Sequence, residues 1–322
     1  MNPKILDPIS GKWLKVIKVS SVNSKRSALG SENSMEPYVI QEDNKFCFFC
    51  KPPYYIMDTS RDYTSLDADY IKKMYKTSRK PFLMYVKDYL IKNYKTHPGP
   101  PQYNACQRLD INTSGIVLVA KKNEYWETCR KIINNKDNTV KIYVCLVNGR
   151  IKNKKGYIYL NIKCGGIPVY CTTEEFDKEA TGSMYSYSYY QVYREYEREG
   201  KVYSLVYVRI FTGRTHQIRV HMKSLGTTIV SDDLYTDESV REKNKELVER
   251  MFLHNIYLGF SHENTNYSVQ LRLLPDLVKC LKRLRVREKF KIDYSVFGNI
   301  QRLRLTATSS RVRRLRPPAF GT

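Results

Sequence analysis

The sequence predicts a folded α+β protein, because segments with strand and helix patterns follow one another without the strict alternation of an α/β fold. Of the 322 residues, 42% are hydrophobic and 12% aromatic, enough to bury a sizeable core. The 27 Tyr and 11 Phe exclude simple disorder in spite of a net charge of +23. No apolar run approaches the roughly 18 residues that a membrane helix needs, so we expect no membrane span.

Hydrophobic spacing and turn signals place the elements in chain order. A short apolar run over 45–50, ended by Pro52, predicts a strand. After Pro81, the residues Phe82, Val86 and Leu90 recur at helical spacing before the Pro-rich loop at 97–101. Further strands are expected at 116–120, 140–147 and 203–211, and further helices at 123–135, 216–225 and 238–251.

Both ends of the chain are basic. Residues 1–37 form an N-terminal extension that lacks the apolar core of a secretory signal. An organelle leader and a plain solvated extension both fit it, and we favour cytoplasm or nucleus, with an organelle as the alternative. Residues 281–322 are expected to be a basic C-terminal extension, because six Arg and no acid occur among the last 22 residues.

The overall charge indicates the kind of partner. An excess of 55 Lys+Arg over 32 Asp+Glu favours nucleic acid, since each neutralised phosphate releases counterions. A membrane surface is disfavoured because the charge is spread along the whole chain. The eight Cys show no disulfide framework, and Cys47 and Cys50 lie three apart on a predicted strand, too divergent to share a metal. We therefore expect buried, reduced thiols and no metal site.

The first segment with reactive side chains is Gln107 to Gly115, directly before the apolar run at 116–119. It reads Gln-Arg-Leu-Asp-Ile-Asn-Thr-Ser-Gly and places Asp110 in a loop rich in hydrogen-bonding groups. Such an Asp is usually a turn former. Spacing alone leaves both a structural and a catalytic role open.

The second segment is Thr212 to His221, which reads Thr-Gly-Arg-Thr-His-Gln-Ile-Arg-Val-His. Thr215 is a plausible helix cap and Gly226 a plausible stop. A helix start preceded by Gly-Arg makes a positive corner that suits a carboxylate or a phosphate. The alternative is a structural ion pair for Arg214 and a satisfied hydrogen-bonding role for His216.

Together these segments resemble the RluA-type family of RNA pseudouridine synthases. That family's signature is His-Arg-Leu-Asp-x-x-Thr-Ser-Gly, followed later by Gly-Arg-Thr-His-Gln-Ile-Arg-Val-His. The resemblance continues in order through Lys51-Pro52, Lys141-x-Tyr143, Asp232-Asp233 and Phe252-Leu253-His254. It covers residues 38–280, which we expect to be one catalytic domain.

The resemblance implies a twisted, mainly antiparallel mixed sheet in two halves that flank a central cleft. It implies a cofactor-free isomerase that detaches uracil from ribose, turns it and rejoins it through carbon 5. Asp110 would be the catalytic aspartate, either attacking the nucleoside or abstracting a proton. Arg214 would pair with it, and Tyr143 would stack on the uracil or help remove the carbon-5 proton. Expected substrate-binding residues are Arg108, Thr113, His216, Gln217, Arg219, His221 and Leu253.

The chain departs from the family pattern at Gln107, where His is usual, at Cys145, where Ala is common, and at Thr228 and Ser231, in place of Pro and Gly. Because the aspartate, arginine and tyrosine remain, we expect altered substrate handling rather than lost activity. An idle RNA-binding protein is the alternative; a metal-dependent nuclease is disfavoured because no acidic cluster adjoins Asp110 in the sequence. We expect a monomer that binds RNA of unspecified class without a small-molecule cofactor.

Overall fold

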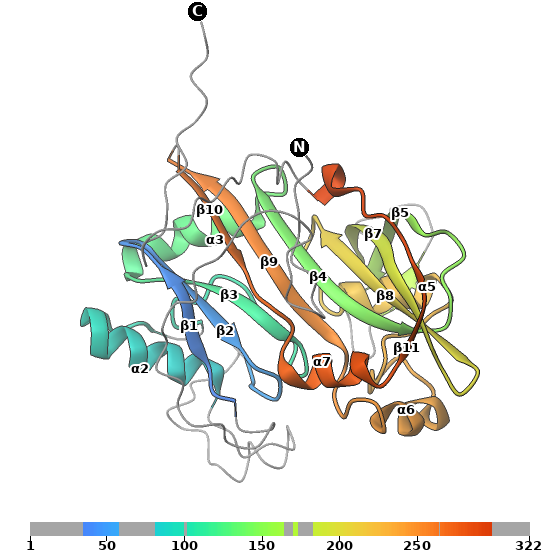
Figure 1. Ribbon diagram of the computed structural model, residues 1–322. Coiled ribbons are helices and arrows are strands. Elements are labelled where there is room, and N and C mark those ends of the chain that lie inside the picture. The colour runs from blue at the N-terminus through green and yellow to red at the C-terminus, as the bar shows by residue number, and fades with distance from the viewer. Residues whose placement is uncertain are drawn as a thin grey trace, which may run out of the picture. The chain divides into compact units, whose positions relative to one another are not determined.

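A computed structural model describes residues 35–57, 81–99, 102–163, 170–172, 183–263 and 265–297 (Figure 1). Residues 1–34 and 298–322, which carry most of the two predicted extensions, lie outside this part of the chain. Within the described ranges, no helix has both the length and the hydrophobicity needed to cross a membrane.

The described residues divide into two compact units. The first unit comprises residues up to Thr139 together with Leu258–Leu271, and it holds Asp110. The second comprises Val140–Tyr257 and the residues from Arg272 onward, and it holds Tyr143 and Arg214. Strand β9 (Leu253–His262) contributes residues to both.

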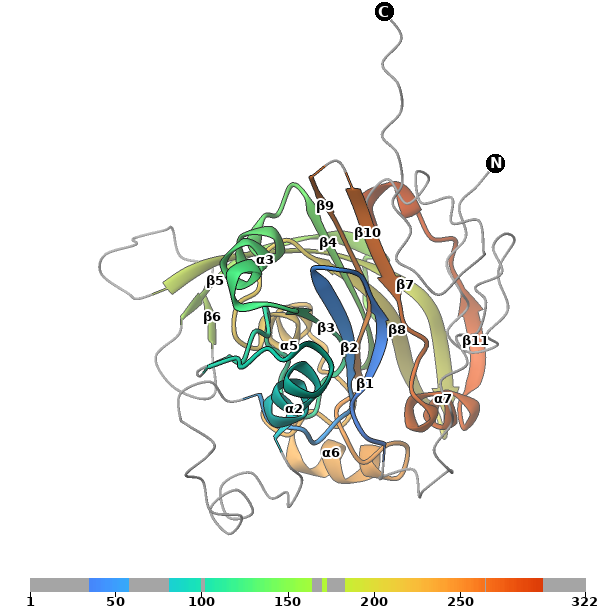
Figure 2. The ribbon, with the colours of Figure 1, turned by 90° about the vertical axis from the view of Figure 1, so that its left-hand side faces the viewer.

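The first unit is built on short antiparallel strands. Its elements are β1 (Tyr38–Glu42), β2 (Phe46–Lys51), α2 (Phe82–Tyr94), β3 (Ser114–Ala120), η1 (Asn123–Tyr125), α3 (Trp126–Asn134) and β10 (Thr265–Gln270). β2 pairs with β1 and β3, and β10 pairs with β9. The rings of Phe82 and Tyr89 on α2 stand edge-on to Phe49 of β2. These contacts hold the helix beside the strands, where Figure 2 shows it.

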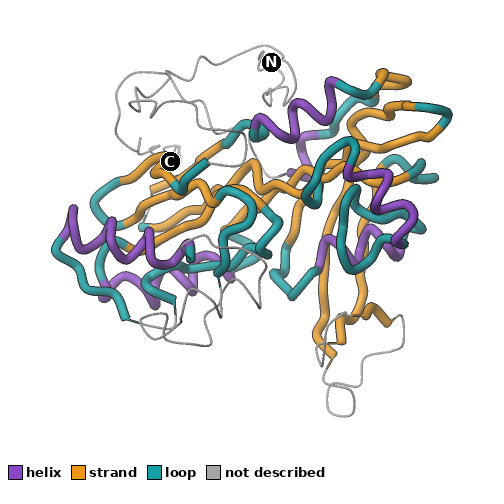
Figure 3. Tube along the Cα trace, turned by 90° about the horizontal axis from the view of Figure 1, so that it is seen from below, coloured by secondary structure: helices purple, strands orange, loops and turns teal. Residues whose placement is uncertain are grey.

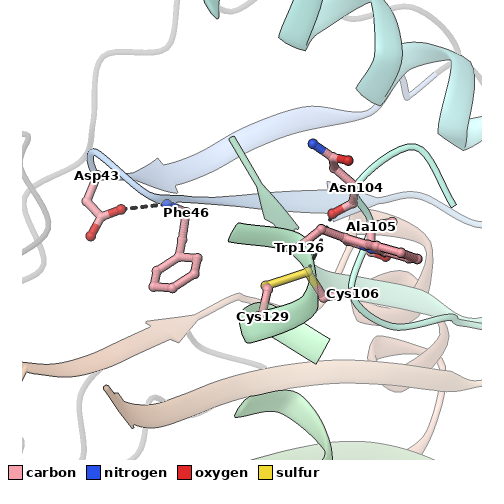
Figure 4. Close-up of a disulfide and its surroundings, with 7 residues drawn as sticks. All are labelled: Asp43, Phe46, Asn104, Ala105, Cys106, Trp126 and Cys129. Atoms are coloured by element: carbon pink, nitrogen blue, oxygen red, sulfur yellow. Dashed lines mark hydrogen bonds between the residues drawn. A yellow bond between two sulfur atoms is a disulfide. The ribbon is translucent and has the colours of Figure 1, made fainter. Parts of the chain in front are cut away.

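The core of the first unit lies between these strands and α3. It includes Phe46, Phe48, Ile116, Leu118, Ile133 and Phe260. A disulfide between Cys106 and Cys129 joins the segment before Asp110 to α3, and the indole of Trp126 donates to the Ala105 carbonyl 3.0 Å away (Figure 4). This disulfide corrects our expectation of reduced thiols, because the fold brings together two cysteines 23 residues apart. Cys47, Cys50, Cys145 and Cys280 are buried and form no disulfide among the described residues, as expected.

The second unit is a larger antiparallel sheet with strand order β4-β8-β7-β5-β6, and β11 pairs with β7. Its strands are β4 (Thr139–Asn148), β5 (Lys155–Lys163), β6 (Tyr170–Thr172), β7 (Ser183–Arg198), β8 (Lys201–Ile210) and β11 (Arg285–Lys289). Its helices are α5 (Gln217–Ser224), α6 (Glu238–Lys245), α7 (Pro275–Lys282) and η2 (Tyr294–Phe297). Figure 3 separates helices from strands along the trace.

The predicted elements are found, with two differences in extent. The helix expected over 238–251 ends at Lys245, because the carbonyl of Asn244 accepts from both Leu247 and Val248 and the chain turns there. The domain boundary expected at 280 lies inside α7, and the fold continues through β11 to Phe297, which is completely buried. The boundary at 280 was predicted from the basic charge of the residues that follow it. Charge alone does not show which of those residues pack into the core.

Candidate active site

The loop that carries Asp110 is held by a buried lysine. Lys51 ends β2 with no solvent exposure, and its Nζ donates to four main-chain carbonyls. These belong to Pro52 at 3.1 Å, Asp110 at 3.2 Å, Ile111 at 3.1 Å and Thr113 at 2.8 Å. Because a buried charge needs several partners to offset its lost hydration, this network fixes the loop around the ammonium group.

The loop itself turns sharply between Asp110 and Thr113, whose N–H donates to the Asp110 carbonyl 3.0 Å away. Leu109 is buried while Arg108 is exposed and Asp110 half-buried, so neighbouring side chains point alternately inward and outward. Gln107, which stands where the family has His, donates from Nε2 to the carbonyl of Ile116 at 2.8 Å. The Gln107 side chain therefore helps to hold β3, the strand that follows the loop.

In the second unit, Tyr143 lies on β4 opposite Val208 of β8 and is 6% exposed. Lys141 precedes it by two residues, so both side chains lie on the same face of the strand. Burial lowers the pKa of Lys141 to about 8. A side chain added at Gly213 would come 3.9 Å from the Lys141 Nζ, so the loop after β8 lies close to this amine.

That loop is organised by Gln217. Its Oε1 accepts from the Arg214 N–H at 3.0 Å and the Thr212 hydroxyl at 2.8 Å, and its Nε2 donates to Tyr187 and Ser188 on β7. Thr215, the expected cap, is not the N-cap of α5. That position is His216, in a left-handed conformation with φ of 53°, and the helix stops at Gly226 with φ of 76° as expected.

Arg219 on α5 is buried among acids. Its guanidinium donates to both carboxylate oxygens of Asp232, at 2.8 and 2.7 Å, and to Asp233 at 2.9 Å. The Asp232 carboxylate also accepts the main-chain N–H groups of Leu234 and Tyr235. The Tyr235 hydroxyl in turn lies 2.9 Å from His216 Nδ1. This network joins α5 to the stretch that follows it.

His221, at the other end of α5, has no solvent exposure. Its Nε2 lies 2.7 Å from the hydroxyl of Ser186 on β7. Burial lowers the pKa of His221 to about 4, because the charged imidazolium would lose its hydration. The ring is therefore neutral at physiological pH.

Leu253 is 4% exposed at the start of β9. The carbonyl of Leu253 accepts from Arg250 at 3.2 Å, and Arg250 forms a two-pronged ion pair with Asp276 on α7 at 2.7 and 3.2 Å. The position of Leu253 thus depends on an ion pair between Arg250 and Asp276, which lies on α7 of the same unit.

The predicted binding residues differ in exposure. Thr113, Gln217, Arg219 and His221 are buried at 0–4% exposure, as is Leu253 at 4%, and their contact with RNA stays a prediction. Arg108 is exposed, and Arg214 and His216 are half-buried. The Arg214 Nε donates to the Tyr185 carbonyl at 3.0 Å. Its predicted pairing with Asp110 would join residues of different units and stays a prediction.

Three supporting residues were absent from the predicted site: Lys51, Asp232 and Arg250. Lys51 and Asp232 lie in matched family segments, but their types do not indicate whether they contact substrate or scaffold. The available signal for Lys51 is a charged residue at the end of an apolar run, because such a residue needs buried partners. Arg250 lies in a stretch expected to be helical and gives no such signal.

The antiparallel sheets and the Asp110 loop are the features that the resemblance leads us to expect of a protein of the pseudouridine synthase class. A family model described as RNA pseudouridylate synthase matches residues 45–224, more than half of the chain. The chain belongs to this family, which confirms the resemblance seen in the sequence.

Curated relatives of the RluA type agree. A dual-specificity RNA pseudouridine synthase RluA of Vibrio parahaemolyticus is 32% identical over 170 residues, which cover 52% of this chain and 64% of the relative. Ribosomal large subunit pseudouridine synthase C of Escherichia coli is 32% identical over 190 residues, 55% of each chain. This chain thus spans between about half and two thirds of the relatives' lengths.

Solved structures support the fold. Human RNA Pseudouridylate Synthase Domain Containing 1 superposes with a TM-score of 0.58 at 20% identity and covers 86% of this chain and 98% of its own. Human RNA Pseudouridylate Synthase Domain Containing 4 gives a TM-score of 0.57 at 17% identity, with 78% and 94% covered. The expected α+β pseudouridine synthase fold is therefore confirmed.

Proposed function

We propose that the protein converts uridine to pseudouridine in RNA, with Asp110 as the catalytic carboxylate. The observation that carries the proposal is the family match over 45–224, which includes the Asp110 loop, Tyr143 and Arg214. The geometry of that loop supports it, because Lys51 holds the Asp110 backbone carbonyl and the residue is half-buried rather than enclosed in the core. A residue whose backbone is held in this way suits reaction at a fixed position.

The reaction is an isomerisation, so no atom is gained or lost. The bond from ribose to uracil N1 breaks, the bond to carbon 5 forms, and the proton lost at carbon 5 is balanced by one gained at N1. Asp110 acts on the nucleoside either as nucleophile or as base, and both roles need an ionised carboxylate. As the resemblance implies, we assign Tyr143 to stacking on the uracil or to removal of the carbon-5 proton, Leu253 to an apolar wall, and Arg214 to the supply of positive charge.

The substrate nucleotide leaves its stack before it reaches Asp110. Unstacking costs a few kcal/mol, and contacts with RNA phosphates offset part of that cost. The exposed Arg108, adjacent to the Asp110 loop, is positioned for such a contact, as is the half-buried His216 of the second unit. Ribosomal RNA is the first RNA to test, since the Escherichia coli relative is named for the large ribosomal subunit.

The test combines site-resolved pseudouridine mapping of cellular RNA with turnover in vitro. We expect Asp110→Ala to abolish pseudouridine formation at the protein's sites while changing RNA affinity less than about twofold, because the carboxylate acts in chemistry and not in docking. Asp110→Asn is the matched control for shape. Turnover retained by either variant would refute the role of Asp110, and unchanged maps with intact RNA crosslinking would favour the idle binder.

A further inference from the structure

Aromatic residues line one face of the second unit's sheet through their strand register. Tyr157 and Tyr159 on β5 lie opposite Tyr189 and Tyr187 on β7. Just beyond the end of β8, Phe211 continues the row, since its N–H donates to the Tyr187 carbonyl at 3.1 Å. Because side chains two apart on a strand share a face, these rings form one surface, which we call the aromatic ladder. It comprises Tyr157, Tyr159, Tyr185, Tyr187, Tyr189 and Phe211.

The rings of the ladder are mutually ordered. Tyr159 stacks on Tyr187 with centroids 4.5 Å apart and planes at 13°, and Tyr187 stacks on Phe211 at 4.2 Å and 11°. The guanidinium carbon of Arg209 lies 4.4 Å from the Phe211 ring centre. Three parallel rings and a cation therefore form a continuous stack across three neighbouring chain segments.

The ladder is open to solvent at one end. Tyr159 is 55% exposed, Tyr157 49% and Tyr185 42%, although tyrosine rings are usually buried when a partner surface exists within the fold. The opposite face of β7 is closed, because Ser186 and Ser188 are fully buried and bond His221 and Gln217 of α5. At the other end, Tyr189 is covered by the edge of Phe297. Several aromatic rings are thus not covered by the part of the chain that the structure describes.

Positive charge borders these rings. Alternation along β5 puts Lys155 and Lys163 on the same face as Tyr157 and Tyr159, and both lysines are exposed. Lys155 has one acidic neighbour, Asp293, at 3.5 Å. Arg209 lies on the ladder, and Arg214 bonds the Tyr185 carbonyl at 3.0 Å. The face therefore combines flat rings with cations.

We infer that the aromatic ladder binds unpaired bases of the RNA substrate by stacking, while the bordering lysines and arginines contact its phosphates. The inference rests on the proposed function in taking RNA as the ligand. Exposed aromatic rings interleaved with cations are what single-stranded nucleic acid recognition requires, since every base has a flat face and every linkage a charge. A paired duplex hides those faces, so the ladder selects single-stranded segments of the RNA, on the face of the sheet opposite the Tyr143 side chain.

The experiment measures the Kd of the full chain for a fluorescein-labelled single-stranded RNA of roughly a dozen nucleotides. The double variant Tyr157→Ser with Tyr159→Ser removes two exposed rings without disturbing the core. We expect its Kd to rise about tenfold or more, as loss of base stacking predicts. The double variant Tyr157→Phe with Tyr159→Phe keeps the rings and should bind like the wild type. Val286→Ser, an exposed apolar residue on β11, is the matched control and should also bind like the wild type.

Salt titration separates stacking from charge. The Ser double variant should keep the wild-type slope of log Kd against log salt, whereas Lys163→Ser should reduce it by about 0.7 per lost phosphate contact. An unchanged Kd in the Ser double variant would overturn the inference, as would an equal rise of Kd in the Phe double variant. If the wild-type protein sediments as an oligomer and the Ser double variant as a monomer, the face is an interface between copies, which would also overturn the inference.

Turnover is measured on the same preparations. If the wild-type protein modifies RNA and the Ser double variant binds RNA normally, the role of the ladder is refuted and the proposed function stands. If the wild-type protein shows no turnover and the Ser double variant binds RNA more weakly, the proposed function is refuted and the role of the ladder stands.

Discussion

At the scale of single residues, the buried ammonium of Lys51 holds the loop of Asp110 through four carbonyls. Lys51→Met leaves those acceptors without a donor inside the protein, so we expect the free energy of unfolding to fall by about 3 kcal/mol. Urea denaturation measures this loss. Lys45→Met is the matched control, because Lys45 pairs with the exposed Glu263 and such surface pairs contribute less than about 1 kcal/mol. Equal effects of the two substitutions would contradict the role of Lys51.

Residue types alone do not reveal this arrangement. The Asp110 and Lys51 positions were visible as motifs, but which of the two is reactive and which is scaffold depends on burial. Gln107 illustrates the same limit, since its amide bonds Ile116 in the chain's own strand although an RNA contact was equally compatible with its type.

At the scale of elements, α5 shows how packing against a sheet buries polar residues and gives them structural roles. The helix reads Gln-Ile-Arg-Val-His-Met-Lys-Ser, and its first six residues are all buried. An amphipathic pattern would have exposed Arg219 and His221. Ser186 of β7 is the partner of His221, and the acids after the helix are the partners of Arg219. Strands such as β2 and β3 were predictable, because each contains an uninterrupted apolar run, 46–50 and 115–120, and both faces are buried.

The neutral His221 makes the stability of this element depend on pH. Its pKa is about 4 in the fold and about 6.5 in an unfolded chain, so between these values the unfolded state binds the extra proton. The contribution of His221 is complete above pH of about 6.5 and is lost as the pH falls toward 4, by about 3 kcal/mol in total. We expect His221→Gln to flatten this part of the stability curve, measured by urea denaturation from pH 7.5 to 4. A His221→Gln curve that stays parallel to the wild type would refute the assignment.

At the scale of the whole molecule, a net charge of +23 requires that RNA binding weaken with salt. The fold accounts for cations on the sheet, such as Lys155 and Lys163, while six further Arg lie between 302 and 316. A sequence could predict the size of this charge but not its distribution over the aromatic ladder, because the ladder depends on the register between β5 and β7.

Removal of residues 301–322 tests how much the six Arg of the C-terminal extension contribute to RNA binding. The cut leaves Phe297 in place, so its contacts with Tyr189 and Tyr207 and the fold around them are retained. If all six Arg contact phosphates, the slope of log Kd against log salt should fall by about 4, since each contact on a single strand contributes about 0.7. Replacing the same six Arg by Lys in the full-length chain is the matched control, because it keeps the charge and should keep most of the slope. An unchanged slope after the deletion would assign the electrostatic contribution to residues 1–300, which include the cations beside the aromatic ladder.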